Sequence, residues 1–310
     1  MKNTKKTVAI IAALCLALTL GACKNTSDNK TPDKDTQSSI EDVQNGTQGS
    51  QNNNIDENTG NTEEKLPENP DAPAVSVKFE SIKDSISLKS TGESIYSSDI
   101  AKLRILSGEN GTSEVTKKIS SVMSSATERN EKQASQLKSD CLNYLEQGAD
   151  TQGWVFETSC EVVRNDAYAV SIIENIYMNA GGAHPSSVAF AYNFDSRTGS
   201  QLTFDSLIGG TSDEKPDEFT AMDKLIRSKL AEKYGEQTLQ SAKEYLGTVD
   251  LDESIAFINA AEDCWYFDDQ GITIYYSTYK IAPYAAGDFE IQITPEELAQ
   301  ISTASNRYFK

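Results

Sequence analysis

Residue types that carry hydrolytic chemistry are sparse in this 310-residue chain, which contains one histidine, His184. Ser186 and Ser187 follow it closely, and a Ser-His-Asp arrangement uses such a histidine as the base that activates a serine hydroxyl. Two residues of separation along the chain do not create that geometry, and the chain has no Gly-x-Ser-x-Gly nucleophile elbow. We therefore interpret His184 as a residue that orders its glycine-rich loop.

Paired carboxylates could cleave a glycosidic bond if one were desolvated and the two faced each other across a cleft. Asp268 and Asp269 lie in a predicted hairpin turn, and Glu296 and Glu297 lie in the first turn of a predicted helix, where acids favour the helix dipole. Adjacent residues in such places do not face each other. The chain also has no calcium-loop, phosphate-loop or zinc-ligand pattern. We predict no catalytic residue, no metal and no cofactor.

The N-terminus has the parts of a bacterial lipoprotein signal. Lysines precede an uncharged apolar run over residues 8–20, and Leu20-Gly21-Ala22-Cys23 forms a lipobox. The run is shorter than the roughly 20 residues that span a bilayer. We predict a signal peptide over residues 1–22 and lipidation of Cys23, with palmitate among the acyl chains, which would anchor the protein on the outer face of the cell membrane.

Three cysteines remain in the predicted mature chain: Cys141, Cys160 and Cys264. An odd number outside the cytoplasm fits one disulfide with a spare thiol, or three free thiols. Cys141 and Cys160 lie at apolar periodic positions, which favours free, buried thiols that pack as small hydrophobes.

The charge balance restricts the partners. The chain has 28 Lys and Arg against 47 Asp and Glu, a formal net charge of −19. It has no concentrated basic patch, so nucleic-acid binding is excluded. A surface protein of this charge attracts cationic proteins.

Residues 24–74 are polar and acidic, and their few apolar residues form no pattern. Such a segment cannot bury enough apolar surface to offset the entropy of ordering. We predict a disordered tether over residues 23–74, which gives the folded part reach above the membrane.

Ordered patterning begins at Val75, and alternating or helical spacing predicts an α+β subdomain over residues 75–178. Its predicted strands lie at 75–79, 86–88, 100–106, 154–162 and 167–177. A long helix begins at Thr112 or Ser113 and ends near Gly148.

A second α+β subdomain is predicted over residues 179–310. Strands are expected at 188–194, 203–204, 265–267, 272–276 and 289–293, with helices at 216–234 and from 295. Each subdomain is expected to be an antiparallel sheet packed by a helix.

Four tyrosines crowd the segment between the last predicted strands: Tyr275, Tyr276, Tyr279 and Tyr284. They could cover a core face, or some could stand in the loop as interface anchors. Periodicity does not decide between these two interpretations.

Five segments resemble, in order and spacing, the extracellular domain of RsiV-type anti-sigma factors. They are NAGGAHP at 179–185, NFDSRTG at 193–199, LTFDSL at 202–207, FDDQG at 267–271 and IAPYAAG at 281–287. The same two-part region occurs in the non-catalytic portion of PdaC-type peptidoglycan deacetylases and in bacterial lipoproteins. The resemblance covers about residues 75–303, and it implies a PdaC-like part over 75–178 and an RsiV-like part over 179–310.

The RsiV branch binds lysozyme through its C-terminal part, so the resemblance implies a lysozyme-like cationic muramidase as partner. The chain shows no sigma-binding segment with a transmembrane helix and no His-rich deacetylase domain, so we expect neither of those activities. Pro185 also stands where the family has glycine after the loop histidine.

We therefore expect a non-enzymatic, lipid-anchored protein of the cell envelope that captures such a muramidase as decoy or sensor. Pro283 and Tyr284 are the preferred anchors. The residues expected to contact the partner are Gly182, His184, Ser186, Pro283, Tyr284 and Ala285. A peptidoglycan or cell-wall glycan module that uses the tyrosines as stacking platforms is the alternative, and a hydrolase comes third.

Overall fold

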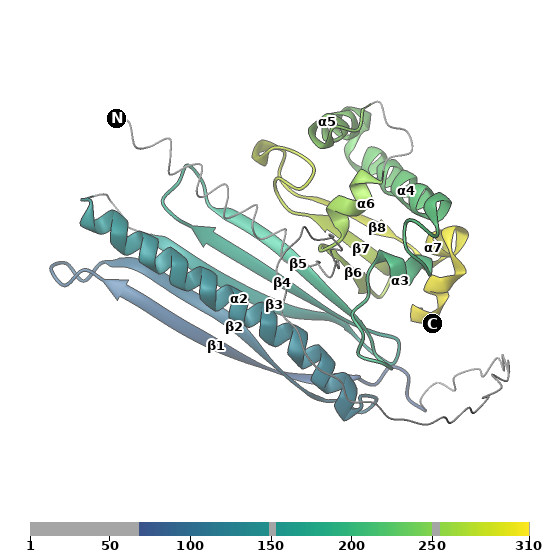
Figure 1. Cartoon of the computed structure of the whole chain (residues 1–310), viewed down its shortest axis with the longest axis horizontal. Coiled ribbons are helices and arrows are strands. Elements are labelled where there is room, and N and C mark those ends of the chain that lie inside the picture. The colour runs from purple at the N-terminus through teal and green to yellow at the C-terminus, as the bar shows by residue number, and fades with distance from the viewer. Residues whose placement is uncertain (1–67, 149–152, 250–254, 310) are drawn as a thin grey trace, which may run out of the picture. The chain divides into compact units, whose positions relative to one another are not determined.

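The computed structural model describes residues 68–148, 153–249 and 255–309. They form a five-stranded sheet with one long helix and a three-stranded sheet with several shorter helices (Figure 1). This arrangement confirms the predicted α+β class with two parts, each a sheet packed by helix. Cys23, the predicted signal peptide and most of the predicted tether lie outside the described residues.

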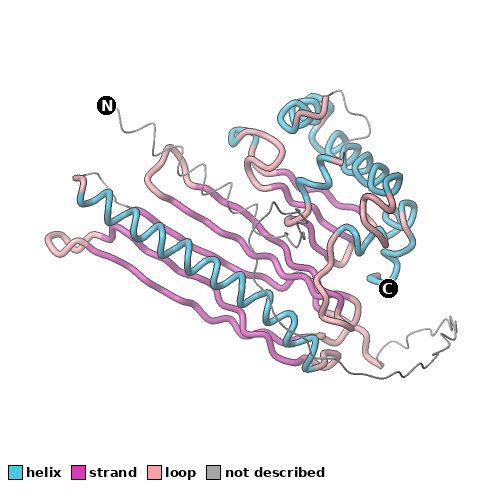
Figure 2. Tube along the Cα trace, in the orientation of Figure 1, coloured by secondary structure: helices cyan, strands magenta, loops and turns pink. Residues whose placement is uncertain are grey.

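The first sheet has the strand order β1-β2-β3-β4-β5. Its strands are β1 (Val75–Ser87), β2 (Ser94–Ser107), β3 (Trp154–Asn165), β4 (Ala169–Asn179) and β5 (Ser186–Asp195). One pairing differs from the expected antiparallel pattern, because β2 and β3 run parallel. The helix α2 (Ser113–Glu146) lies between them in the chain, and a parallel pair needs such a crossover (Figure 2).

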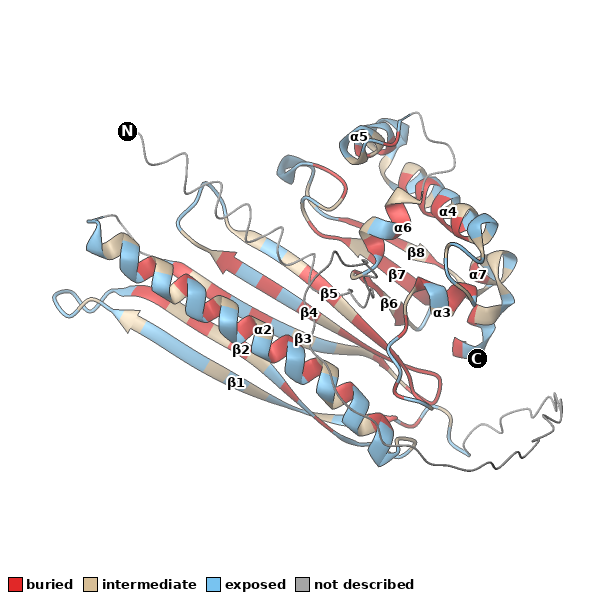
Figure 3. Cartoon of the chain, in the orientation of Figure 1, coloured by how far each residue is buried: buried red, intermediate tan, exposed pale blue. Residues whose placement is uncertain are grey.

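The helix α2 matches the predicted helix closely. Its N-cap is Thr112, whose side chain accepts a hydrogen bond from the Val115 backbone N–H. The buried apolar side chains of α2 follow one stripe along the helix (Figure 3). They are Val115, Ile119, Met123, Ala126, Ala134, Leu137 and Cys141.

The strand β5 lies in the first sheet, whereas the sequence placed residues 188–194 in the second subdomain. It pairs with β4 from Met178↔Ser186 to Ala169↔Asp195, because a short loop returns the chain directly beside β4. Its other edge is also covered, since Ala189 N donates to Ser277 Oγ at 2.9 Å and Ala191 N donates to the Asp263 carbonyl at 2.9 Å. Both edges of β5 therefore hold it in place.

The second sheet is antiparallel, with the order β6-β7-β8. Its strands are β6 (Trp265–Asp268), β7 (Gly271–Tyr276) and β8 (Phe289–Ile293). The helices near it are α3 (Phe204–Ile208), α4 (Pro216–Tyr234), α5 (Glu236–Leu246), α6 (Ala256–Ala261) and α7 (Pro295–Ile301). Trp265 lies at the centre of this core and contacts the Phe204 and Phe267 rings.

One element of this part differs in type from the sequence prediction. Thr203 and Phe204 were expected to continue a strand, but Phe204 begins the helix α3. Ser206 Oγ accepts a hydrogen bond from the Thr203 backbone N–H, and a serine at this position supports a helix start.

Cys160 and Cys264 are free thiols, as the sequence favoured. Cys141 and Cys264 are buried and Cys160 is half-buried. Burial, with a smaller contribution from the Glu174 carboxylate, raises the pKa of Cys160 to about 12, so this thiol stays protonated and unreactive near neutral pH.

Ordered packing begins before Val75, in the last residues of the predicted tether. Ala72 and Ala74 are buried. Asn110 Nδ2 donates hydrogen bonds to the carbonyl oxygens of Asn69 and Ala72, at 2.9 and 2.8 Å. The folded part therefore starts a few residues earlier than the hydrophobic pattern indicates.

Candidate functional site

Two loops that are distant in the sequence meet through three rings. His184, in the loop between β4 and β5, stacks on Tyr284, with ring centroids 3.7 Å apart and planes 15° apart. The Tyr279 hydroxyl lies 3.1 Å from His184 Nε2. We call His184, Tyr279 and Tyr284 the aromatic cluster. Tyr279 and Tyr284 keep 49% and 38% of their surface exposed, so the cluster faces solvent.

Tyr279 adopts a backbone conformation that disfavours its own side chain. Its φ is 71°, the only positive φ of a non-glycine residue among the described residues. Tyr245 of α5 supports it, because its hydroxyl donates to the Tyr279 carbonyl at 3.1 Å. Strain of this kind persists where surrounding contacts hold it, and it concentrates at functional sites.

We predict that the Tyr279→Gly variant is about 1 kcal/mol more stable than Tyr279→Ala, because both lose the ring but only glycine relieves the positive φ. Urea unfolding of the two variants measures this difference. At ordinary exposed positions alanine equals or exceeds glycine in stability, so equal or higher stability of Tyr279→Ala would contradict the strained conformation.

The structure brings several of the predicted contact residues together. Pro283 precedes the short 3-10 helix Tyr284–Ala286, and Pro283, Tyr284 and Ala285 are exposed. Gly182 is exposed in the opposite loop, and Ser186 is the first residue of β5.

His184 matches the interpretation as a residue that orders its loop. Its Nδ1 lies 3.0 Å from the Pro185 carbonyl oxygen and its Nε2 faces Tyr279. Both ring nitrogens therefore pair with groups other than a serine hydroxyl. Tyr276 is buried and donates to the Phe257 carbonyl at 2.9 Å, so the tyrosines divide between the core and the surface.

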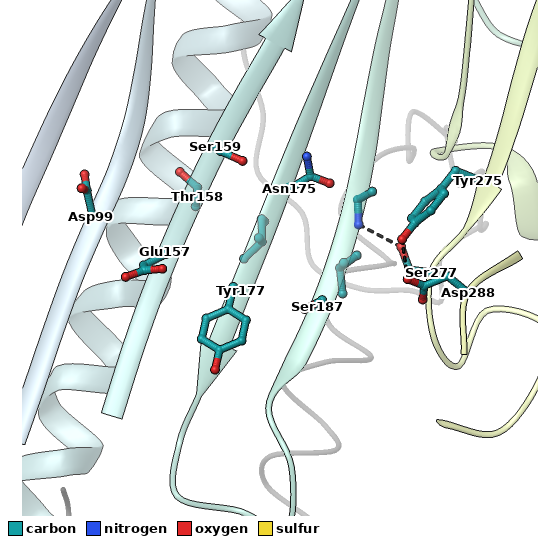
Figure 4. Close-up of a pocket in the computed structure, with 13 residues that line it drawn as sticks. Asp99, Glu157, Thr158, Ser159, Asn175, Tyr177, Ser187, Tyr275, Ser277 and Asp288 are labelled. Carbon is teal, nitrogen blue, oxygen red and sulfur yellow. Dashed lines mark hydrogen bonds between the residues drawn. The ribbon is translucent and has the colours of Figure 1, made fainter. Parts of the chain in front are cut away.

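A groove of about 520 Å³ lies next to these loops, on the face of the first sheet that points away from α2. Strand register aligns Asp99, Glu157, Tyr177 and Ser187 in one row across β2 to β5. Figure 4 shows these side chains on the sheet, with residues of the second part beside β5. The residues that line this sheet groove are Asp99, Glu157, Thr158, Ser159, Asn175, Ile176, Tyr177, Ser187, Val188, Ala189, Tyr275, Ser277 and Asp288.

The two ends of the sheet groove are acidic. Asp99 accepts a hydrogen bond from Ser81 and pairs with Lys83 at 2.9 Å, and these two contacts lower the pKa of Asp99. At the other end the Tyr275 hydroxyl donates to Asp288 (Figure 4). Burial, together with the Asp288 carboxylate, raises the pKa of Tyr275. Tyr275 therefore remains a neutral donor to a charged acceptor.

Sequence reasoning missed the sheet groove and Tyr245. The groove residues come from strands spread between positions 99 and 288, and each strand shows only alternation. The one sequence signal for the groove is the run of polar side chains at the outward positions of β3 and β4. A sheet face that is exposed to water shows the same pattern, so this signal does not identify a binding site.

The described residues show no cluster of three or more His, Cys, Asp and Glu side chains arranged to hold a metal ion. Within the same residues, no helix has both the length and the apolar character that crossing a membrane requires.

The fold and these surfaces define an α+β protein with an exposed aromatic cluster and an acidic groove. Residues 213–296 match the model of a family described as "Protein of unknown function (DUF3298)". This segment contains Tyr245, Tyr279 and Tyr284 but neither His184 nor β5. A search of curated proteins finds no match.

The solved structures that are similar to the chain include two proteins of the DUF3298 family. A member of the duf3298 family from Bacteroides fragilis has a TM-score of 0.55 and is 18% identical in sequence. The match covers 77% of this chain and 99% of the Bacteroides chain. A DUF3298 family protein from Pseudomonas aeruginosa has a TM-score of 0.40 and is 17% identical in sequence. The match covers 73% of this chain and 93% of the Pseudomonas chain. The Bacteroides structure shows a shared fold. The RsiV-type resemblance stays a prediction.

Proposed function

We propose that this protein is a non-enzymatic lipoprotein of the cell envelope that captures a cationic, lysozyme-like muramidase as decoy or sensor. The observation that carries the proposal is the aromatic cluster, in which His184 stacks on an exposed Tyr284. The anchor of the proposed surface is Tyr284.

The geometry favours binding because the rings are held before a partner arrives. Tyr284 is stacked on one face, and Tyr279 is fixed through hydrogen bonds to His184 and from Tyr245. Rings that are already ordered lose little conformational entropy when they bind. Tyrosine also combines a large apolar ring with a polar hydroxyl, which is typical of the residues that dominate protein interfaces.

The charge of the chain supports the choice of a cationic partner. A net charge of −19 attracts a basic protein over a range of about 10 Å at 0.1 M salt. Capture driven by charge should weaken as salt rises, whereas stacking on a neutral glycan should hardly change. The salt dependence therefore separates this proposal from the glycan-binding alternative.

We predict that Tyr284→Ala weakens capture of hen-type lysozyme by about 2 kcal/mol, or roughly 30-fold in Kd, because it removes the central ring of the cluster. Biolayer interferometry of the full chain in detergent, at low and moderate salt, measures this change. Phe79→Ala is the control, since Phe79 is 54% exposed on β1, the opposite edge strand of the first sheet from β5.

Unchanged affinity in a folded Tyr284→Ala variant would remove the anchor assignment. Soluble muropeptides are tested in parallel. Binding of muropeptides with no binding of lysozyme would contradict capture and favour wall attachment.

A further inference from the structure

The sheet groove carries polar groups that the fold leaves unused. Glu157, Ser159, Asn175 and Ser187 are exposed, and within the described residues none of their side chains makes a hydrogen bond or an ion pair. They project from three neighbouring strands onto one face, at the strand spacing of about 4.8 Å. The floor therefore presents hydroxyl, amide and carboxylate groups in a fixed array.

The charge of this array is negative. Asp99, Glu157 and Asp288 line the groove, and Lys83 is the cation paired at its edge. Lys83 forms its ion pair with Asp99, and the more distant Glu157 carboxylate also raises the pKa of Lys83, but Glu157 itself forms no ion pair among the described residues. A ligand with a positive group beside Glu157 would gain a charge-assisted hydrogen bond.

Tyrosine rings add flat surfaces to the polar floor. Tyr177 lies in the same row as Glu157 and is 36% exposed, and Tyr275 lies on the side of the second sheet (Figure 4). The volume of about 520 Å³ is within the usual range for small-ligand sites. Rings of this kind can stack on the apolar faces of a ligand and attract a cation.

The backbone of β4 excludes one class of ligand. β4 pairs with β3 and β5 along its length, so this strand has no free edge for an added peptide strand, whereas β3 pairs with β2 only over Trp154–Glu157. Recognition at β4 must come from side chains alone. Hydroxyl and amide groups beside a ring and a carboxylate complement a polyhydroxylated ring that carries an amine.

We propose that the sheet groove binds short oligosaccharides with free amino groups, of the β-linked glucosamine type, with an amine at Glu157 and a sugar ring at Tyr177. This inference does not depend on muramidase capture, because it uses none of the residues of the aromatic cluster. The groove would therefore bind a carbohydrate, whereas the aromatic cluster would bind a protein.

Isothermal titration calorimetry of the full chain in detergent tests the proposal, with the β-1,4-linked glucosamine tetramer and its fully N-acetylated counterpart as probes. We expect the amine tetramer to bind at least about tenfold more tightly, and Glu157→Gln to remove that preference. Asn175→Ala should weaken binding of both tetramers. Glu161→Gln is the matched control, since Glu161 is exposed on the same strand outside the groove and should leave binding unchanged.

Three results would overturn the proposal: equal binding of the two tetramers, an unchanged preference in Glu157→Gln, or displacement of the sugar by tetralysine at equal affinity. The last would show that charge alone is recognised. Lysozyme capture should survive Glu157→Gln, and binding of the amine tetramer should survive Tyr284→Ala. The failure of one proposal is thus distinguishable from the failure of the other.

Discussion

Replacing Glu174 with alanine is expected to lower the free energy of unfolding by about 3–5 kcal/mol, because the change leaves a charge and two polar groups without their partner. Glu174 lies on β4, is only 1% exposed, and contacts Arg129 and Asn130 of α2. It pairs with Arg129, accepts from Asn130 Nδ2 at 2.6 Å and accepts from the Tyr192 hydroxyl at 2.9 Å. Asn130 is itself fully buried, so bulk solvent does not reach its side chain in the intact protein.

Guanidinium unfolding followed by circular dichroism measures this loss. Glu174→Gln keeps the shape and one acceptor, so its loss should fall between that of Glu174→Ala and zero. Glu80→Ala is the control, since Glu80 pairs with Lys78 and Arg104 at the surface, where such pairs contribute less than about 1 kcal/mol. A loss below about 1 kcal/mol in Glu174→Ala would show that the buried network is not needed to join α2 to the sheet.

Gly271→Ala is expected to destabilise the second part by about 3–5 kcal/mol, because overpacking and backbone strain act together. Gly271 begins β7 with a φ of +140°, and a Cβ at this position would lie 2.1 Å from the Ile293 carbonyl oxygen. The clashing atom belongs to the backbone of β8, which cannot turn away as a flexible side chain would.

A second glycine with a positive φ serves as a control, because it distinguishes the cost of the steric clash from the cost of the backbone strain. Gly247 follows α5 with a φ of +69°, and a Cβ there would meet nothing within 4 Å. Gly247→Ala should therefore cost only the strain, about 1–2 kcal/mol. Thermal unfolding of both variants tests the difference, and a Gly271→Ala variant as stable as Gly247→Ala would contradict the close approach of β8.

The two proposed surfaces use the same connecting segments. Ser187 and His184 lie near the start of β5, while Ser277 and Tyr279 belong to one turn after β7. Asp288 and Tyr284 lie in one loop before β8. A partner seated on the aromatic cluster would therefore touch the backbone that positions one wall of the sheet groove. Substitutions on the cluster and on the groove floor, such as Tyr284→Ala and Glu157→Gln, test each surface without changing this shared backbone.

Local patterns determined much of the fold. The helices α2 and α4, the hairpin of β6 and β7, and the strand β8 lie where the sequence predicts them. Each depends on interactions within a few residues, such as the Thr112 cap, the apolar stripe of α2 and the turn at Asp268 to Gly271. The resemblance placed His184 and Tyr284 in one candidate surface, and the structure brings them into contact.

The amino-acid sequence by itself therefore determined the α+β class, most of the elements and two residues of the aromatic cluster. Only the tertiary structure decided that β5 joins the first sheet, that β2 and β3 run parallel, and that Asp99, Glu157 and Tyr177 form one row. It alone placed Tyr245 beneath Tyr279 and Glu174 against Arg129. Helix caps and periodicity act between neighbours in the chain, whereas strand pairing and buried ion pairs join residues tens of positions apart, and no local pattern encodes which partner each will meet.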